Sequence, residues 1–126
     1  MRGIAGRLLA VLVMVGVLVA PSVASAQSTG LLPTAPSDPN ALSRVETLDG
    51  TPPGHRLVGQ QALAIAERSS KVKEALKDHP NAKPEVFLKG PNDWQISWFT
   101  PGTGDARKEV AQVKVNDRSA TIVEAW

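Results

Sequence analysis

The 126-residue chain contains no cysteine. Small exported domains often rely on disulfides to compensate for a small hydrophobic core, and this chain can form none. The same absence excludes thiolate chemistry and any zinc site built on cysteine ligands. The sequence also lacks an Asn-x-Ser/Thr acceptor for N-glycosylation, so nothing in it supports a eukaryotic secretory route.

A basic excess is missing once the first 26 residues are set aside. The chain has 14 Lys and Arg against 12 Asp and Glu, and Arg2 and Arg7 account for the whole difference. Residues 27–126 are therefore formally neutral, and no run of five basic residues occurs in them. Because nucleic acid binding needs a clustered basic surface, we expect no nucleic acid partner.

Motifs for catalysis and for metal or cofactor binding are absent as well. The histidines His55 and His79 show no HExxH or paired-ligand spacing, and both are expected to be solvated loop residues. The stretch 102–104 lacks the Lys-Ser/Thr of a phosphate loop, and no Gly-x-Ser-x-Gly elbow or calcium loop is present. We therefore expect a protein that is not an enzyme and holds no metal or cofactor. The aspartates of the predicted turns are expected to bond nearby backbone amides: Asp93, Asp105 and Asp117.

The first 26 residues have the layout of a secretory signal peptide. Arg2 and Arg7 precede an apolar run of 13 residues, and Pro21 and the small residues 24–26 follow. A membrane-spanning helix needs roughly 20 apolar residues, so this run is short for a permanent anchor. We expect cleavage between Ala26 and Gln27 and a secreted or extracytoplasmic envelope protein. The alternative is an uncleaved anchor, which would be the only contact with the membrane.

Residues 27–55 are rich in proline, glycine and small polar residues. Such a stretch buries too little apolar surface to offset its ordering entropy, so the composition predicts a disordered, semi-rigid linker. The ordered domain is expected to span residues 56–126. Its first part, Leu57 to Lys77, has apolar residues at helical spacing, interrupted by Ser69-Ser70. One kinked helix and two short helices, the second capped by Ser70, are equally allowed before Pro80.

The remainder of the chain predicts four short strands, near 85–89, 94–98, 111–115 and 121–126. The clearest signal is the alternation of Trp94, Ile96 and Trp98 with polar residues, which places these three side chains on one face. A helix followed by strands with hairpin-length loops indicates an α+β fold, with the helix packed on a four-stranded antiparallel sheet. The three apolar side chains are expected to lie under the helix.

Three aromatic residues are candidates for partner binding: Trp98, Phe99 and Trp126. Exposed aromatics dominate binding hot spots, although burial is the default for Trp98 in so small a core. A self-contained domain should pack Trp126 against the last two strands, whereas a domain completed by further chain or a partner should leave it exposed. A core of this size without disulfides is marginal, which makes self-association a further expectation.

Three segments together resemble the PepSY domain family: Gln61–Ala66 on the helix, Asp93–Trp98, and Val110–Val123. The resemblance covers residues 57–126 and is strongest toward exported actinobacterial PepSY-like proteins. The chain departs from the family pattern at Asn116, where Asp is common, and at Ala120, where Gly is common. Glycine reaches positive φ without steric cost, so the departure at Ala120 leaves the turn type open.

The resemblance implies an extracytoplasmic, non-catalytic module that modulates a protease. We therefore expect an exported binding or regulatory module of the cell envelope, with an envelope protein or peptidase as partner. The alternative is the truncated ectodomain of a longer PepSY-like membrane protein with a structural or sensory role. The ending Glu124-Ala125-Trp126 is similar to the midpoint of such longer chains.

Export with cleavage is directly testable by mass spectrometry of the secreted and envelope fractions. We expect a species that begins at Gln27, in its free or cyclised form. Recovery of only the full-length, membrane-bound chain would support the uncleaved anchor instead.

Overall fold

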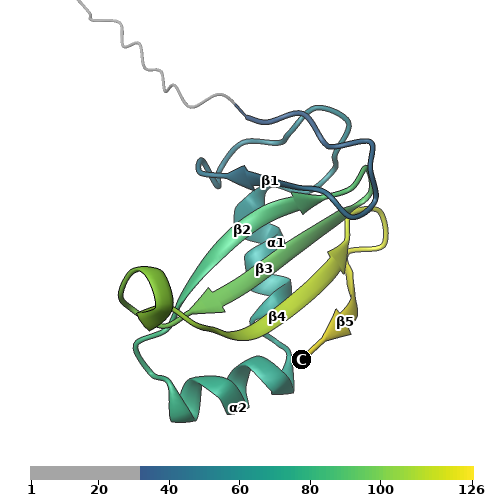
Figure 1. The fold of residues 1–126 in the computed structure, drawn as a ribbon. Coiled ribbons are helices and arrows are strands. Elements are labelled where there is room, and N and C mark those ends of the chain that lie inside the picture. Colours follow the sequence, from purple (N-terminus) through teal and green to yellow (C-terminus); the bar gives the residue numbers. More distant parts are fainter. Residues whose placement is uncertain (1–31) are drawn as a thin grey trace, which may run out of the picture.

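The computed structural model describes residues 32–126, so the predicted signal peptide and its cleavage site at Ala26 and Gln27 lie outside the described residues. The described chain forms two helices and a five-stranded sheet (Figure 1). In chain order the elements are β1 (Leu42–Val45), α1 (Gly59–Ala66), α2 (Ser70–Asp78), β2 (Lys83–Lys89), β3 (Asp93–Phe99), the short 3-10 turn η2 (Gly104–Ala106), β4 (Glu109–Asn116) and β5 (Thr121–Ala125).

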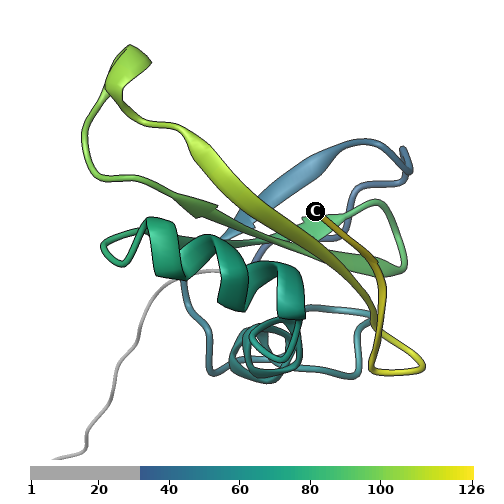
Figure 2. The ribbon, with the colours of Figure 1, turned by 90° about the horizontal axis from the view of Figure 1, so that it is seen from below.

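The sheet is an antiparallel meander in which spatial order follows chain order, β1-β2-β3-β4-β5. Both helices lie on the same side of it, which leaves the other side uncovered by any helix or strand of residues 32–126 (Figure 2). The predicted α+β class is confirmed at this level. The predicted strand count is wrong, because the sheet has five strands rather than four.

The additional strand, β1, comes from the segment predicted to be a disordered linker. Leu42–Val45 pairs with β2, and Val45 lies opposite Val86 with only 3% of its surface exposed. Pro52 and His55 are also buried. The prediction of disorder up to residue 55 is therefore wrong for residues 32–55. Composition misleads here because an edge strand needs little apolar surface of its own when a formed sheet is there to pair with it.

Two short helices form, which resolves the alternative that the sequence left open. The second helix is capped by Ser69 rather than Ser70, since the Ser69 Oγ accepts a hydrogen bond from Lys71 N at 3.2 Å. At the start of α1, the Gln61 side chain accepts from Val58 N at 2.9 Å. Each helix thus begins with a side chain that satisfies a backbone amide at or beside its first turn.

The core lies between the helices and the inner face of the sheet. Trp94, Ile96 and Trp98 are between 0% and 2% exposed and belong to one cluster with apolar residues of both helices, which confirms the predicted inner face of β3. Their neighbours across the sheet are aliphatic and equally buried: Val86, Leu88, Ala111, Val113 and Val115.

The turn between β4 and β5 adopts the conformation that usually favours glycine. Ala120 has φ of 57° and donates its N–H to Asn116 O at 2.9 Å. The Asn116 side chain accepts from Arg118 N and Ser119 N, which fixes the rest of the turn. The departure from the family pattern at Ala120 thus leaves the strand pair intact, at a conformational cost of about 1 kcal/mol.

Gly90 offers a test of how β1 is held against β2. Gly90 has φ of +56°, and a Cβ at this position would lie 2.7 Å from the Pro39 Cα. We expect Gly90→Ala to lower the free energy of unfolding by about 2 kcal/mol or more, measured by urea denaturation, because strain and a backbone clash add together.

Gly54→Ala is the matched control for this substitution. Gly54 has φ of +81° but no atom within 4 Å of its Cβ position, so only the conformational term of about 1 kcal/mol applies. Equal losses of unfolding free energy in the two variants would show that the clash with Pro39 adds nothing to the cost of the backbone conformation.

Candidate functional site

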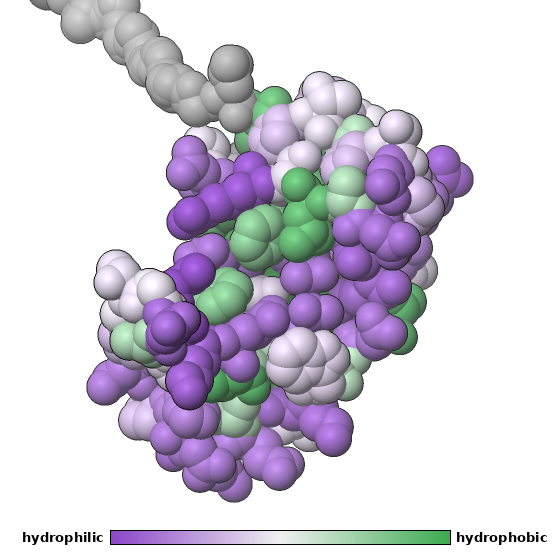
Figure 3. All heavy atoms as spheres, viewed as in Figure 1, coloured by the Kyte–Doolittle hydropathy of each residue, from purple (hydrophilic) through white to green (hydrophobic). Residues whose placement is uncertain are grey.

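The candidate site is the side of the sheet that faces away from the helices, here called the open face. Side chains alternate along a strand, so the pairing register defines which residues point to this side. The face is mostly hydrophilic, with a few apolar side chains among the polar ones (Figure 3). Its members from the central strands are Glu85, Phe87, Gln95, Ser97, Phe99, Gln112 and Lys114, with Leu42 and Arg44 from β1 and Glu124 and Trp126 from the β5 end.

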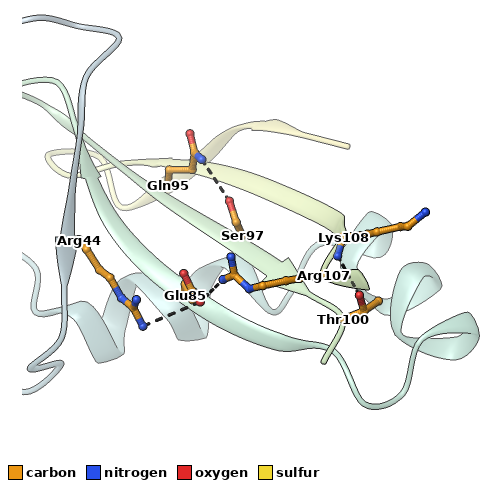
Figure 4. Close-up of polar contacts among 7 residues, drawn as sticks. All are labelled: Arg44, Glu85, Gln95, Ser97, Thr100, Arg107 and Lys108. Carbon is orange, nitrogen blue, oxygen red and sulfur yellow. Dashed lines mark hydrogen bonds and ion pairs between the residues drawn. The ribbon is translucent and has the colours of Figure 1, made fainter. Parts of the chain in front are cut away.

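The centre of the open face is polar and closely packed. Gln95 and Ser97 on β3 are 6% and 0% exposed, and the Gln95 Nε2 donates to the Ser97 Oγ at 3.1 Å (Figure 4). The register places Gln112 of β4 beside Ser97. Gln95 and Ser97 are therefore buried within the open face and satisfy each other's hydrogen bonding.

An ion-pair cluster centred on Glu85 borders this polar centre. The Glu85 carboxylate accepts from Arg107, and the Arg44 guanidinium lies 3.9 Å from the same carboxylate oxygen (Figure 4). Arg107 also stacks on Phe99, with its guanidinium carbon 3.8 Å from the ring centroid. The cluster therefore ties β1, β2 and the β3–β4 connection together on one side of the open face.

The aromatic candidates fall on opposite sides of the sheet. Trp98 is 2% exposed on the helix side, so its predicted role in partner binding is wrong. Phe99 is half-buried on the open face under Arg107. Trp126 is 51% exposed and pairs through its backbone with Gln112, at 2.9 and 3.0 Å, which places its indole on the open face. The packing expected of Trp126 in a self-contained domain is not found.

The connection between β3 and β4 stands clear of the rest of the molecule (Figures 1 and 2). We call residues 101–106 the hairpin tip, and all six are exposed. The tip is braced at its base by Thr100, whose hydroxyl donates to Ala106 O at 3.2 Å and accepts from Lys108 N at 2.9 Å. Thr100 N also donates to Lys108 O at 2.8 Å. The tip is thus a short, fixed projection.

Asp117 has a role that its position in a turn did not predict. Its carboxylate is buried and accepts from Trp94 Nε1 at 2.9 Å and from Arg56 N and Leu57 N at 2.8 and 3.0 Å. These donors are distant in sequence, so the expectation that Asp117 bonds nearby amides is wrong. No local pattern signals such a contact, because it depends on how the loop before α1 meets the sheet.

The two histidines differ in their surroundings. His79 is exposed, as expected. His55 is 8% exposed and lies edge-on to Trp94, with 5.4 Å between ring centroids, and its buried Nε2 has no hydrogen-bond partner among residues 32–126. The expectation of a solvated loop residue is therefore wrong for it. No acid, thiol or second histidine gathers with either residue into a group of metal ligands within residues 32–126.

Two shallow hollows flank the site. One, of about 170 Å³, lies between β1 and the start of β2 and is lined in part by Arg44 and Glu85. The other, of about 200 Å³, lies between the base of the hairpin tip and the loop after α2. No helix in residues 32–126 is long and apolar enough to cross a bilayer. The second hollow is lined by both His79 and Thr100, and the Thr100 hydroxyl is hydrogen-bonded to Ala106 O and Lys108 N.

No family model, curated protein sequence or solved structure matches the chain. The resemblance to the PepSY family therefore stays an expectation from the sequence.

Substitutions at Asp117 test how far the fold relies on its carboxylate. Asp117→Ala leaves three donors without their acceptor, so we expect the free energy of unfolding to fall by about 3 kcal/mol or more. Asp117→Asn keeps one acceptor oxygen, so its free energy of unfolding should lie between those of Asp117→Ala and the native protein. Both are measured by chemical denaturation.

Asp105→Ala is the matched control, because Asp105 is an exposed turn aspartate. It should change stability by less than about 0.5 kcal/mol. A loss below about 1 kcal/mol for Asp117→Ala would contradict the role assigned to the carboxylate.

Proposed function

We propose that the protein is an exported, non-catalytic binding module of the cell envelope that acts on a protein partner through the open face. A peptidase is the partner class that we favour, since the sequence resembles a family associated with protease modulation. The single observation that carries the proposal is the open face itself, which no helix or strand of residues 32–126 covers.

The composition of the open face supports protein binding rather than simple exposure to solvent. Protein interfaces are enriched in aromatic residues and arginine, with polar groups that bond across the contact. Here Phe87, Phe99 and Trp126 surround a polar centre, and Arg44 lies at the edge with 57% of its side chain exposed.

The arrangement gives less support to catalysis. The buried polar groups of the open face are an amide and a hydroxyl, Gln95 and Ser97, and they bond to each other. The Ser97 Oγ has no histidine or carboxylate among its recorded hydrogen-bond partners within residues 32–126, so nothing there would act as its general base. The proposed module is therefore non-catalytic.

The alternative proposal is a structural or sensory ectodomain of a longer PepSY-like membrane protein. The half-exposed indole of Trp126 favours it, because further chain could cover that surface. The nucleotide sequence after codon 126 separates the two proposals: an apolar span encoded there would favour the ectodomain.

The main proposal is tested by binding of the purified exported protein to a panel of metallo- and serine peptidases, measured by surface plasmon resonance. We expect at least one pair to bind, and Trp126→Ala to raise its Kd by about tenfold or more, as for an aromatic hot spot. The same variant should leave the unfolding midpoint nearly unchanged, because the indole is half exposed.

Gln60→Ala is the matched control, since Gln60 is exposed on α1, on the opposite side of the molecule. Its Kd should stay within twofold of the native value. Equal effects of the two substitutions would show that binding does not use the open face, and absence of binding to every peptidase would reject this partner class.

A further inference from the structure

We propose that residues 32–48, here called the arm, are exchanged between two copies of the chain, which thereby form a dimer. In this dimer β1 of each copy pairs with β2 of the other copy. The exchange does not depend on the peptidase binding proposed above. It also leaves the residues of each open face unchanged, because an identical β1 takes the place of the original one.

The arm is held at one edge of the domain by contacts that a second copy also offers. As the first strand in the sheet order, β1 pairs with β2 alone, through four residue pairs. On either side of the strand, Ala41 O accepts from Gly90 N at 3.0 Å and Leu48 O accepts from Gln60 N at 2.8 Å. All these partners belong to the part of the chain that follows the arm, so they are the same in any copy.

The arm covers apolar surface that needs an occupant. Val45 is 3% exposed and lies opposite Val86, which is also 3% exposed, and Leu32 and Leu48 pack against the same core cluster. Departure of the arm would expose this surface together with the edge of β2, and an unpaired edge is a template for another strand. The arm of a second copy is the occupant that fits, since its register and its apolar side chains already match the edge.

Residues 49–55 form a hinge between the arm and the rest of the domain. The domain holds the chain again at Arg56, whose N–H donates to Asp117 at 2.8 Å. Within the described part of the chain, the backbone hydrogen bonds of the hinge consist of one bond, from His55 N to Pro52 O at 3.0 Å. A hinge of this length spans about 23 Å when fully extended, which is enough to carry the arm to a neighbouring copy.

The composition of the hinge suits the extended form that the exchange requires. Pro53 restricts the backbone of Pro52 to extended conformations, and proline-rich segments act as semi-rigid spacers. Gly54 has φ of +81° in the closed chain, and glycine adopts other backbone conformations at little steric cost. The hinge can therefore open without strain at its one residue of positive φ.

Protein concentration decides between the closed monomer and the dimer, because both contain the same arm contacts. Exchange of an identical element is a route to dimers that needs no new complementary surface. A tethered segment competes with a second copy at an effective concentration in the millimolar range. We therefore expect a mostly monomeric protein at about 10 µM and a substantial share of dimer at about 1 mM.

A pair of introduced cysteines reports which chain supplies the arm, since the native chain contains no cysteine. Arg44 and Phe87 lie opposite each other on β1 and β2, within the Cα separation that a disulfide spans. In Arg44→Cys combined with Phe87→Cys, the disulfide joins one chain in the monomer and two chains in the exchanged dimer. After oxidation of the purified exported protein, non-reducing gels should show about tenfold or more covalent dimer at about 1 mM than at about 10 µM.

Lys114→Cys combined with Glu124→Cys is the matched control. These residues lie opposite each other on β4 and β5, which belong to one hairpin, so their disulfide should stay within one chain at both concentrations. Leu42→Cys combined with Lys89→Cys is a second reporter of the same β1–β2 pairing, for use if the first pair prevents folding.

Several results would overturn the exchange. One is a β1–β2 disulfide that stays within one chain at every concentration, and another is a yield of covalent dimer equal to that of the control pair. A dimer detected by light scattering whose β1–β2 disulfide is intrachain would show that the copies associate through another surface. The proposed function survives each of these results if Trp126→Ala weakens peptidase binding, and absence of peptidase binding leaves the exchange standing.

Discussion

Three hydrogen bonds converge on the Asp117 carboxylate, and they join parts of the chain that are distant in sequence. One donor is the indole of Trp94 in the centre of the sheet, and the others are the amides of Arg56 and Leu57 just before α1. A buried carboxylate needs such donors to offset its loss of water. The turn between β4 and β5, the core of β3 and the entry to the helical layer are thereby fixed together.

This arrangement lets β3 serve two surfaces at once. Its even-numbered residues, Trp94 to Trp98, complete the core, and the odd-numbered Gln95 and Ser97 form the polar centre of the open face. The open face is structured as well, because Gln95 and Ser97 are buried there and the ion pairs of Glu85 link β1, β2 and the β3–β4 connection.

The parts predicted from the sequence are those set by local periodicity. The alternation around Trp94, Ile96 and Trp98 is a property of one strand, so both its existence and its buried face could be read directly. The side of the sheet on which Trp98 lies follows from the same pattern, and the burial expected by default for Trp98 excludes it from partner contact. The polar centre was visible in the sequence as the intervening residues of this strand.

The parts that were missed depend on contacts between distant segments. β1 has a composition typical of a linker and becomes a strand only because the edge of β2 is available to it. The burial of His55 and the three bonds of Asp117 likewise arise when the loop before α1 packs on the sheet. No periodic signal marks such residues, since each satisfies a need created elsewhere in the fold.

The position of β1 has a consequence for how the molecule opens. Every other neighbouring pair in the sheet is joined by a hairpin connection, the longest being residues 100–108, but residues 46–82 separate β1 from β2. Closing so long a loop costs more entropy than closing a hairpin, and the ladder between β1 and β2 has only four residue pairs. We therefore expect the segment before α1 to open locally before the other strands do. The bond from Arg56 N to Asp117 marks where we expect this opening to end.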